Sequence, residues 1–320
     1  GLNNNDPVST WTDLSPANNN ATQTGSARPT YRTASMNGMP TISFDGIDDY
    51  MVLSNNVIPF NATTIYVTRV NGTTGNYQAL LKNSHFMDCA NNTVAHFGAY
   101  YQRWLTSYQT QNSTPGILIH QDLSNNKSNF YKNGVTGGSH NNGTRSSAAA
   151  STIGANGNAV SAGQFLNGDI AEVIVFNNVY LYPINLDLIW NYLSSKYNIS
   201  IANDYYTFDN SHPNEVVGVG NNSGVVHQSA KGRGIVNLTN PNGLTSPGSY
   251  CFFGHDNGSL AASTNVPAGW NGRRVNRTWR VDNTNYSGSY NLTFDLASIS
   301  IGLTSDFVLL IDDDGDFSNG

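Results

Sequence analysis

The sequence predicts an all-β protein that begins with a two-sheet antiparallel sandwich, and three observations support this prediction. Short apolar segments recur between turn signals over the first two thirds of the 320 residues. Charged residues are only 11% of the chain and aromatic residues another 11%, with 31 glycines, which is typical of a folded β protein with long polar loops. A clear helical pattern occurs only once. The length favours two domains.

The strands of the first part are bounded by turn dipeptides such as Asn37-Gly38 and Asn133-Gly134. Between such signals, alternating or continuous apolar residues predict strands. The expected strands are 40–44, 51–53, 63–70, 78–81, 94–100, 116–121 and 151–154, with a hairpin over 129–135. This succession is the pattern of an antiparallel sandwich.

One stretch, 165–197, organises this part of the chain. Residues 168–176 are apolar on both alternating sets, so we expect an inner strand covered on both faces. Pro183 then suits the first turn of a helix. The residues that follow at helical spacing form one apolar face: Leu186, Ile189, Trp190, Leu193 and Tyr197. We expect this helix to pack at the margin of the sandwich and close it.

Beyond Tyr197 the composition loosens through 198–210, which suggests a junction. We therefore expect domains at 1–203 and 204–320. In the second domain, strands are expected near 218–220, 248–255, 273–281, 290–296 and 307–311. The start at Gly1 and the stop at Gly320, inside an acidic loop, predict a piece of a longer, processed protein whose second domain is truncated at its C-terminal end.

The order of several motifs in the first part resembles the laminin-G-like branch of the concanavalin-A-like jelly-roll sandwiches, the lectin/glucanase fold. The motifs are Trp11-x-Asp13-Leu14-Ser15, Ile42-Ser43-Phe44-Asp45-Gly46-x-Asp48-Asp49-Tyr50, Tyr131-x-Asn133-Gly134, Ile153-Gly154, Asn167 to Val173, and the closing helix with Tyr192-Leu193-x-x-Lys196-Tyr197. The resemblance covers roughly residues 1–200 and implies a lectin-like module.

The second part resembles an uncharacterised β-domain that follows laminin-G-like modules in large secreted proteins of the Bacteroidota. The shared features are His212-Pro213, Gly254-His255-Asp256, Arg277-x-Trp279-Arg280-Val281 and the final acidic loop. By resemblance, such modules occur in large adhesins exported by the type IX route, including gliding-motility adhesins. The resemblance implies a secreted, cell-surface location and no activity.

Two acidic turns are candidate metal sites. The terminal loop places Asp312, Asp314 and Asp316 at alternate positions, the spacing with which carboxylates converge on calcium, although Phe317 stands where a helix-loop-helix motif has glycine. The alternative is an acidic turn that caps an edge strand.

The second acidic turn contains Asp45, Asp48 and Asp49. In sandwiches of this type, calcium often lies at one rim near the ligand. The alternative, which we favour, is that these carboxylates accept backbone N–H bonds of their own turn.

Exposed aromatic residues are the candidate ligand-binding site. We expect them at a turn between strands, where aromatic faces can stack on sugar rings and amides can bond to hydroxyls. The residues are Tyr100, Tyr101, Arg103, Trp104 and Tyr108. The alternative is burial in the core, the commoner fate of large aromatic residues.

Catalysis is not expected. Glu172 shares a strand face with Ile170 and Ile174 and needs a partner such as Arg or Lys, whereas Asp169, three residues earlier, is expected on the opposite face. The chain therefore lacks the paired carboxylates of a glycosidase. Its seven histidines show no zinc spacing, and no phosphate-binding or nucleophile motif occurs.

Other partner classes are also excluded. The net charge of −6 without a basic stripe argues against nucleic acid, and no apolar run is long enough to span a membrane. A disulfide between Cys89 and Cys251 is possible but not favoured, since the two fall in different expected domains.

We therefore expect a non-catalytic, extracellular adhesin fragment that binds glycans or surface proteins, with calcium as the candidate cofactor, and that contacts other modules of the same long chain. The alternatives are a structural spacer or filament-building module and a divergent polysaccharide hydrolase.

Overall fold

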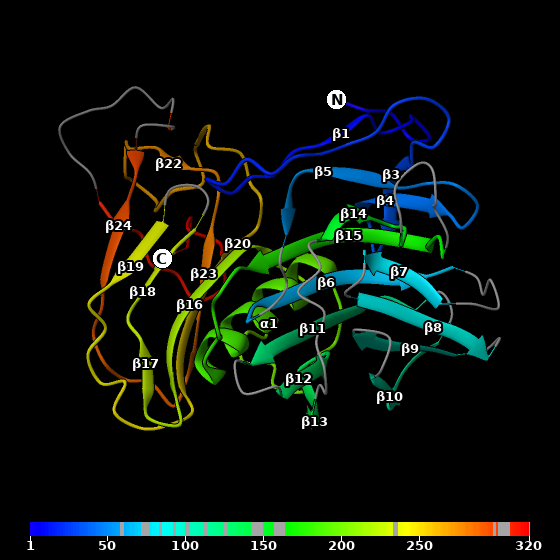
Figure 1. Ribbon diagram of the computed structural model, residues 1–320. Coiled ribbons are helices and arrows are strands. Elements are labelled where there is room, and N and C mark those ends of the chain that lie inside the picture. The colour runs from blue at the N-terminus through cyan, green and yellow to red at the C-terminus, as the bar shows by residue number, and fades with distance from the viewer. Residues whose placement is uncertain are drawn as a thin grey trace. The chain divides into compact units, whose positions relative to one another are not determined.

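The computed structural model describes residues 1–57, 61–71, 77–82, 85–91, 94–99, 103–111, 114–123, 127–141, 150–156, 164–232, 236–296, 299 and 308–319, without the side chains of 56–57, 77, 85–96, 98–99, 103–111, 140–141 and 150. It divides into two compact units (Figure 1): unit 1 contains Gly1–Leu181 with Ile199–Ala202, and unit 2 contains Tyr182–Asn198 with Asn203–Gly320.

Unit 1 is a sandwich of two antiparallel sheets, as predicted. The eight-stranded sheet has the order β1 (Thr10–Trp11), β2 (Ala21–Thr22), β5 (Met51–Val57), β14 (Ala150–Ile153), β7 (Tyr77–Leu81), β8 (His85–Asn91), β9 (Val94–Ala99) and β10 (Arg103–Gln111). The seven-stranded sheet has the order β13 (Val135–Asn141), β12 (Lys127–Lys132), β11 (Gly116–Leu123), β6 (Thr63–Val70), β15 (Asn167–Phe176), β4 (Met39–Asp45) and β3 (Thr30–Met36).

The core of unit 1 lies between the two sheets. Met51 and Leu80 of the eight-stranded sheet pack in one buried cluster with Phe44, Tyr66 and Leu118 of the other. Phe97 in β9 adds edge-on ring contacts across the sandwich, with ring centroids 6.2 Å from Tyr66 and 5.7 Å from Phe130. Burying apolar area between the sheets is what stabilises this unit.

The inner position expected for residues 168–176 is confirmed for 168–170, where β15 pairs with β4 on one side and β6 on the other, whereas residues 172–176 pair with β6 alone. The register shifts between Ile170 and Glu172, which leaves Ala171 as a bulge. As a result Asp169 lies opposite Arg69 and Glu172 lies opposite Val67, two β6 positions on one face. The expectation that Asp169 and Glu172 point to opposite faces is therefore wrong.

A buried ion pair that the sequence did not suggest joins β15 to β6. Asp169 is only 1% exposed, and its Oδ2 accepts bonds from Arg69 Nε at 2.7 Å and Ser35 Oγ at 3.0 Å. Arg69 Nη2 lies 2.6 Å from the same oxygen and also donates to Ser35 Oγ. A buried carboxylate is tolerated only when such a partner offsets the loss of its hydration.

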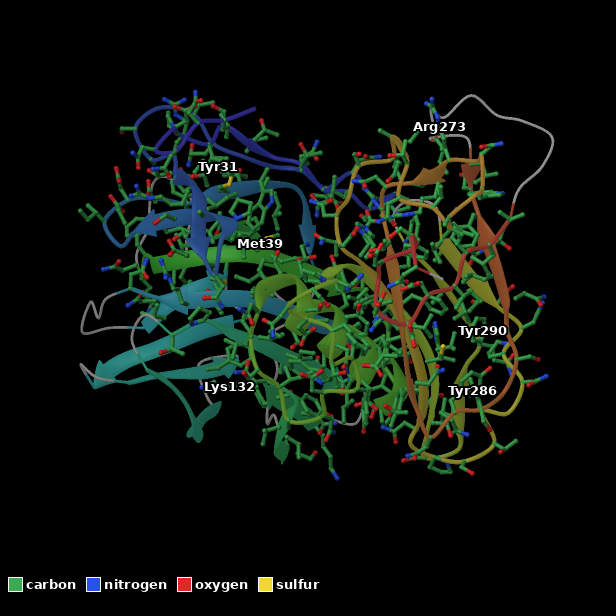
Figure 2. All side chains as sticks on the ribbon, turned by 180° about the vertical axis from the view of Figure 1, so that it is seen from behind. Tyr31, Met39, Lys132, Arg273, Tyr286 and Tyr290 are labelled. Atoms are coloured by element: carbon green, nitrogen blue, oxygen red, sulfur yellow. The ribbon has the colours of Figure 1, made fainter. Side chains whose placement is uncertain are left out.

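Unit 2 is built around a four-stranded antiparallel sheet with the order β17 (Val225–His227), β16 (Asn214–Asn222), β20 (Ser249–His255) and β23 (Trp279–Thr284). A three-stranded sheet contains β18 (Ser229–Lys231), β19 (Val236–Thr239) and β24 (Asn291–Phe294), and a short pair contains β21 (Ala262–Ser263) and β22 (Arg274–Val275). Tyr286 belongs to the buried core of this unit and stacks with Tyr290, with ring centroids 6.3 Å apart (Figure 2).

Helix α1 (Pro183–Tyr197) forms as predicted, with Pro183 in its first turn. Its grouping differs from expectation, because it belongs to unit 2 rather than to the sandwich. Ile184 packs with Val216, Tyr250 and Phe252 of the four-stranded sheet. Gly218 and Gly220 make this packing possible, since an added Cβ would overlap the rings of Phe252 and Tyr250.

The helix is buried on most sides rather than along one stripe. Asp187 and Asn191 are buried in it, and both have partners from their own unit. Asp187 Oδ2 accepts bonds from Tyr250 Oη at 2.6 Å and from Asn222 Nδ2 at 2.5 Å. Burial raises the pKa of this carboxyl, and the two donors oppose that rise. The sequence pattern gave no sign of this polar core.

Two further segments differ from expectation. Residues 273–281 were expected as one strand and form β22 and β23 with a break between them. Residues 308–311 were expected in a strand but lie outside strands in the structure, with Leu309 65% and Ile311 86% exposed.

The Arg69–Asp169 pair leads to the first prediction. Arg69→Ala leaves a buried carboxylate without its counter-charge and should lower the free energy of unfolding by about 3 kcal/mol. Asp169→Asn should cost less, since Arg69 retains access to solvent. Urea denaturation of the full chain, followed by circular dichroism, measures both.

Arg28→Ala is the matched control, because the guanidinium of Arg28 makes only surface bonds. If Arg69→Ala cost no more than Arg28→Ala, the pair would not hold β15 in place.

Candidate functional site

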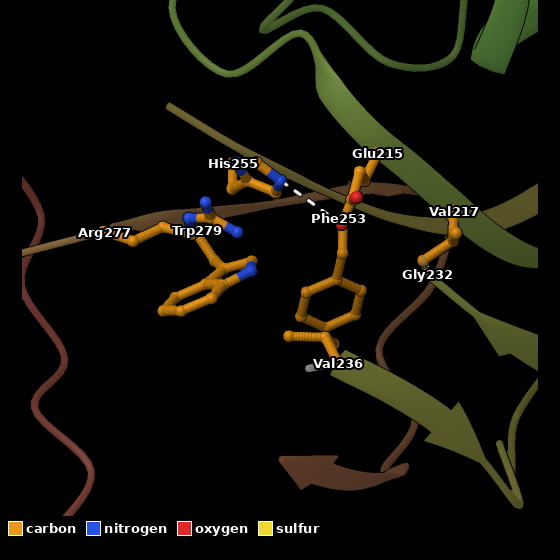
Figure 3. Close-up of a pocket in the computed structure, with 8 residues that line it drawn as sticks. All are labelled: Glu215, Val217, Gly232, Val236, Phe253, His255, Arg277 and Trp279. Atoms are coloured by element: carbon orange, nitrogen blue, oxygen red, sulfur yellow. Dashed lines mark ion pairs between the residues drawn. The ribbon is translucent and has the colours of Figure 1, made fainter. Parts of the chain in front are cut away.

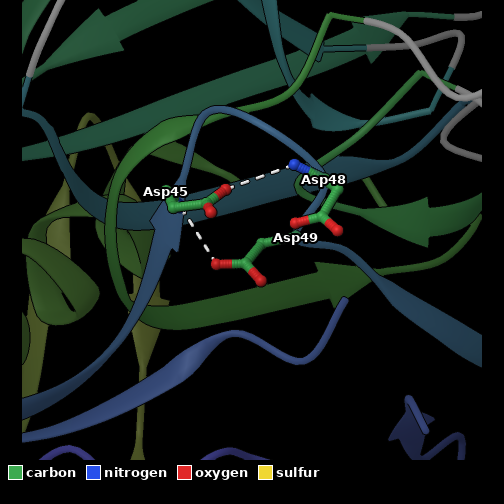
Figure 4. A group of neighbouring side chains, drawn as sticks. All are labelled: Asp45, Asp48 and Asp49. Atoms are coloured by element: carbon green, nitrogen blue, oxygen red, sulfur yellow. Dashed lines mark hydrogen bonds between the residues drawn. The ribbon is translucent and has the colours of Figure 1, made fainter. Parts of the chain in front are cut away.

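The acidic turn between β4 and β5 brings Asp45, Asp48 and Asp49 together (Figure 4), with one carboxylate oxygen of each within 4.8 Å of the others. The turn depends on Gly46, whose φ is +79° and whose place leaves no room for a Cβ against Asn167. Asp45 Oδ1 accepts bonds from the N–H groups of Ile47, at 2.8 Å, and Asp48, at 3.3 Å.

Asp49 is the buried member of this turn, at 5% exposed. Its Oδ2 accepts the N–H of Asp45 at 3.0 Å. Burial, followed by the negative charges of Asp45 and Asp48, raises the pKa of Asp49 to about 6. Asp45 and Asp49 therefore bond to backbone N–H groups of their own turn, as the favoured alternative predicts. Calcium binding here remains a prediction that only a measurement with the ion can test.

The terminal loop is arranged differently from its sequence spacing. The carboxylates that lie within 4.8 Å of one another are those of Asp312, Asp313 and Asp314. Asp312 Oδ1 instead accepts the N–H groups of Asp314 and Gly315, at 3.0 and 2.5 Å. Asp316 Oδ1 accepts bonds from Ser318 and from Asn265 Nδ2, the latter at 3.1 Å. Asp312 and Asp314 therefore come together with Asp313, whereas Asp316 is not part of this group.

The side chains of the expected aromatic site all fall outside the described part of the chain. Tyr100 and Tyr101 lie outside the described residues, as do the side chains of Arg103, Trp104 and Tyr108. The backbone shows that the last three belong to β10, a strand at the end of the eight-stranded sheet, whereas a turn was expected. Their role in binding stays a prediction.

A small hollow in unit 2 brings a carboxylate, a histidine and an arginine together (Figure 3). It is lined by Glu215, Val217, Gly232, Val236, Phe253, His255, Arg277 and Trp279. Its volume is about 10 Å³, close to the least that one water molecule needs. The hollow therefore has room for about one water molecule.

His255 is the buried titratable group of this hollow, at 4% exposed. Its Nδ1 accepts the N–H of Asn257 at 3.0 Å, so in the neutral ring the proton is on Nε2, which faces Glu215 Oε2 at 3.4 Å. Burial and the nearby Arg277 charge lower the pKa of His255 to about 4. The imidazole is neutral near pH 7 and acts there as a structural group.

The motif residues of the second domain meet at one corner of unit 2. Thr278 Oγ1 donates to Asp256 Oδ2 at 2.7 Å and lies 3.1 Å from His212 Nε2. Tyr206 Oη donates to the carbonyl of His212, and Gly254 has no space for a Cβ beside that contact. The motifs around His212, Gly254 and Thr278 therefore join the start of β16 to the end of β20 and the start of β23.

Two side chains of reactive types, a carboxylate and a thiol, are buried in the described part of the chain. Asp169, which shares a face with Glu172, is buried and paired with Arg69 rather than open to a cleft. Cys251 is a free, buried thiol, and burial raises its pKa to about 12, which makes it unreactive. The side chain of Cys89 lies outside the described part.

Comparisons with known proteins place part of this chain in context. Residues 219–320 match a family described as a domain of unknown function, DUF8202. No curated protein sequence matches the chain. No helix within the described ranges has the length and apolar content that crossing a membrane requires.

Several solved structures are similar at low identity. They include Trypanosoma rangeli sialidase in complex with the inhibitor DANA (10% identity, 57% of this chain and 30% of that chain, TM-score 0.34). The binding domain of Paraclostridial Mosquitocidal Protein 1 aligns at 12% identity (59% and 51%, TM-score 0.41), and the binding domain of Botulinum neurotoxin DC in complex with rat synaptotagmin II at 9% (79% and 65%, TM-score 0.33).

The alignments thus take in less than two thirds of each of these proteins. At these identities and scores the similarities carry no argument about function, so the sandwich architecture rests on the strand order itself.

Asp49 leads to a prediction about pH. Its folded pKa, about 6, lies above the ordinary value of 3.8, so the folded state binds an extra proton between about pH 4 and 6. The stability that this residue contributes is therefore lost as pH rises through that window. Asp49→Asn keeps an acceptor for the Asp45 N–H and should be more stable than the parent above pH 6 in calcium-free buffer, as measured by urea denaturation.

Calcium provides the second arm of that experiment. If the turn binds the ion, calcium chloride should stabilise the parent above pH 6 and leave Asp49→Asn unchanged. Asp6→Asn, which alters a surface acid of the same unit, is the control. The contradicting result concerns the unfolding free energy of the parent minus that of Asp49→Asn. If this difference were lower at pH 4 than at pH 6, the carboxyl of Asp49 would not be buried as described.

His255 should have the opposite pH dependence. The unfolded chain binds its proton near pH 6.5 and the folded chain only near pH 4, so the stability of unit 2 should fall as pH drops through that window. His255→Asn retains an acceptor for the Asn257 N–H and should remove this part of the slope.

The measured quantity is the difference in unfolding free energy between parent and His255→Asn at each pH, which cancels the contribution of His212. His227→Asn in β17 is the control. A difference that stays constant from pH 4 to 7 would show that His255 is not buried as described.

Proposed function

We propose that the chain is a non-catalytic binding fragment of an extracellular, cell-surface adhesin, with glycans as its ligands and calcium as an aid at the Asp45–Asp49 turn. The observation that carries the non-catalytic part is the hollow at Glu215 and His255. There a carboxylate and an imidazole lie 3.4 Å apart, in a space that has room for about one water molecule.

The choice of glycans follows from the chemistry of the chain. Antiparallel sandwiches present their loops as binding surfaces on a rigid scaffold. Here the loops are rich in amides and hydroxyls, and the chain has 17 tyrosines and five tryptophans. Amides bond to sugar hydroxyls while aromatic faces cover the apolar side of the ring. The resemblance to laminin-G-like modules supports the same ligand class.

A second candidate role is a structural spacer that contacts other modules of a long chain. It is favoured by the exposed apolar residues Val308, Leu309 and Ile311 in unit 2, which are 64% to 86% exposed. Apolar side chains exposed in series are typical of surfaces that pack against another molecule.

A glycan array tests the proposal. The full chain should bind a restricted set of glycans, binding should weaken after EDTA, and the bound glycans should be recovered intact by mass spectrometry. Asp49→Asn should abolish the EDTA effect because it removes a ligand of the turn.

Binding to no glycan, together with self-association in analytical ultracentrifugation, would contradict the lectin role and favour the spacer. Shortened polysaccharide whose formation is lost in Glu172→Gln would contradict the non-catalytic role.

A further inference from the structure

The hairpin β21–β22 in unit 2 carries a ten-residue loop, 264–273, whose base is fixed. Ser263 pairs with Arg274 across the two strands. Arg274 Nε donates to the carbonyl of Asn265 at 2.8 Å, and its guanidinium lies 4.5 Å from the ring centroid of Phe317. The guanidinium of Arg274 therefore stabilises the base of the loop through these contacts.

Trp270 is at the far part of this loop, and its side chain is 38% exposed. Among the described tryptophans it is the one classed as exposed, although this residue type is generally well buried. A turn fixes its backbone: Trp270 N–H donates to the carbonyl of Pro267 at 3.0 Å, and Gly269 has φ +81°, as residue three of a type II turn requires.

The indole itself is held flat. A Cβ on Gly272 would overlap Cζ2 and Cη2 of Trp270, so one face of the six-membered ring lies directly on the glycine backbone. The exposed area is then mainly the opposite face. A surface aromatic ring that is fixed in this way loses little entropy when a second flat surface stacks on it.

Two exposed polar residues follow Trp270 in the chain. Arg273 and Asn271 follow Trp270 on the same loop, and both are exposed. No described residue pairs with the guanidinium of Arg273, which lies at the periphery of unit 2 in Figure 2. An exposed guanidinium and an exposed indole on one short loop suit a ligand with an apolar face and a carboxylate or sulfate.

We infer that Trp270, Asn271 and Arg273 form a binding site for an acidic sugar residue. The C–H face of the sugar stacks on Trp270, its anionic group pairs with Arg273, and its hydroxyls bond to Asn271. This deepens the proposed glycan binding, on which it rests, and assigns it to unit 2. A membrane is the less suitable partner, because insertion needs several large apolar side chains and the loop offers one.

Isothermal titration of the full chain tests this inference, with polygalacturonate as the acidic probe and dextran as the neutral one. The parent should bind polygalacturonate and not dextran. Trp270→Ala should weaken binding about tenfold, or about 1.4 kcal/mol. Gly272→Ala should weaken it too, since the new Cβ displaces the indole while leaving it in the chain.

Arg273→Gln should weaken binding to polygalacturonate and flatten its dependence on salt. Lys231→Gln, which removes one exposed positive charge elsewhere in unit 2, is the matched control and should bind like the parent. Leu14→Ala, an exposed apolar residue of unit 1, is the control for Trp270→Ala.

Three results would overturn the inference. One is a parent that does not bind polygalacturonate. Another is binding that Trp270→Ala and Arg273→Gln leave unchanged, which would contradict this site and leave the proposed glycan binding intact. The third is Trp270-dependent binding to phosphatidylserine vesicles at least as tight as binding to the sugar, which would identify a membrane contact instead.

Discussion

The position of β15 between β4 and β6 is the constraint on which the seven-stranded sheet depends. A strand with neighbours on both sides must satisfy its backbone hydrogen bonds in both directions. Ile170 enters the core between the sheets, and the next residue, Ala171, is a bulge. The bulge brings Val173 back onto the same core, so one strand supplies apolar contacts on either side of an irregularity.

The same bulge determines the electrostatics of the sandwich. It places Asp169 and Glu172 on one face, an arrangement that a regular strand would forbid. Two carboxylates on one face of a strand could serve chemistry, but Asp169 is buried and bonded to Arg69 and Ser35. The geometry therefore uses the charge to fix β3, β6 and β15 to one another. Unit 2 also has buried ionisable groups with structural roles, since Asp187 and His255 are each hydrogen-bonded to residues of their own unit.

The sequence was informative where a pattern is local. The doubly apolar run before Pro183, the helix after it and the Asn-Gly turns all identify elements that the structure contains, because period and turn chemistry act over a few residues. It failed where the outcome depends on distant segments. Ala171 has no feature that marks a bulge, and Arg69 is 100 residues from Asp169 in the sequence. The helix groups with unit 2 because Ile184 packs against Val216 and Tyr250, which come later in the chain.

The candidate site was predicted only in part. Asp45, Asp48 and Asp49 do come together, since residues of one turn must, whereas Asp316 turns towards Asn265, 51 positions away. Trp270 was missed because nothing local separates an exposed tryptophan from a buried one. Gly269 and Gly272 lie on either side of Trp270 in the sequence, but a glycine has many roles in loops. Only the structure shows that the Trp270 ring packs against the backbone of Gly272.

Hydrogen exchange followed by mass spectrometry tests the central claim most directly, because an inner strand exchanges only through large-scale opening of its sheet. The account predicts that amides of 168–170, which lie between β4 and β6, are among the slowest to exchange in unit 1, slower than those of β3 and β13 at the two edges of the same sheet. Exchange of that segment as fast as the edge strands would place it outside the sheet and contradict the architecture described.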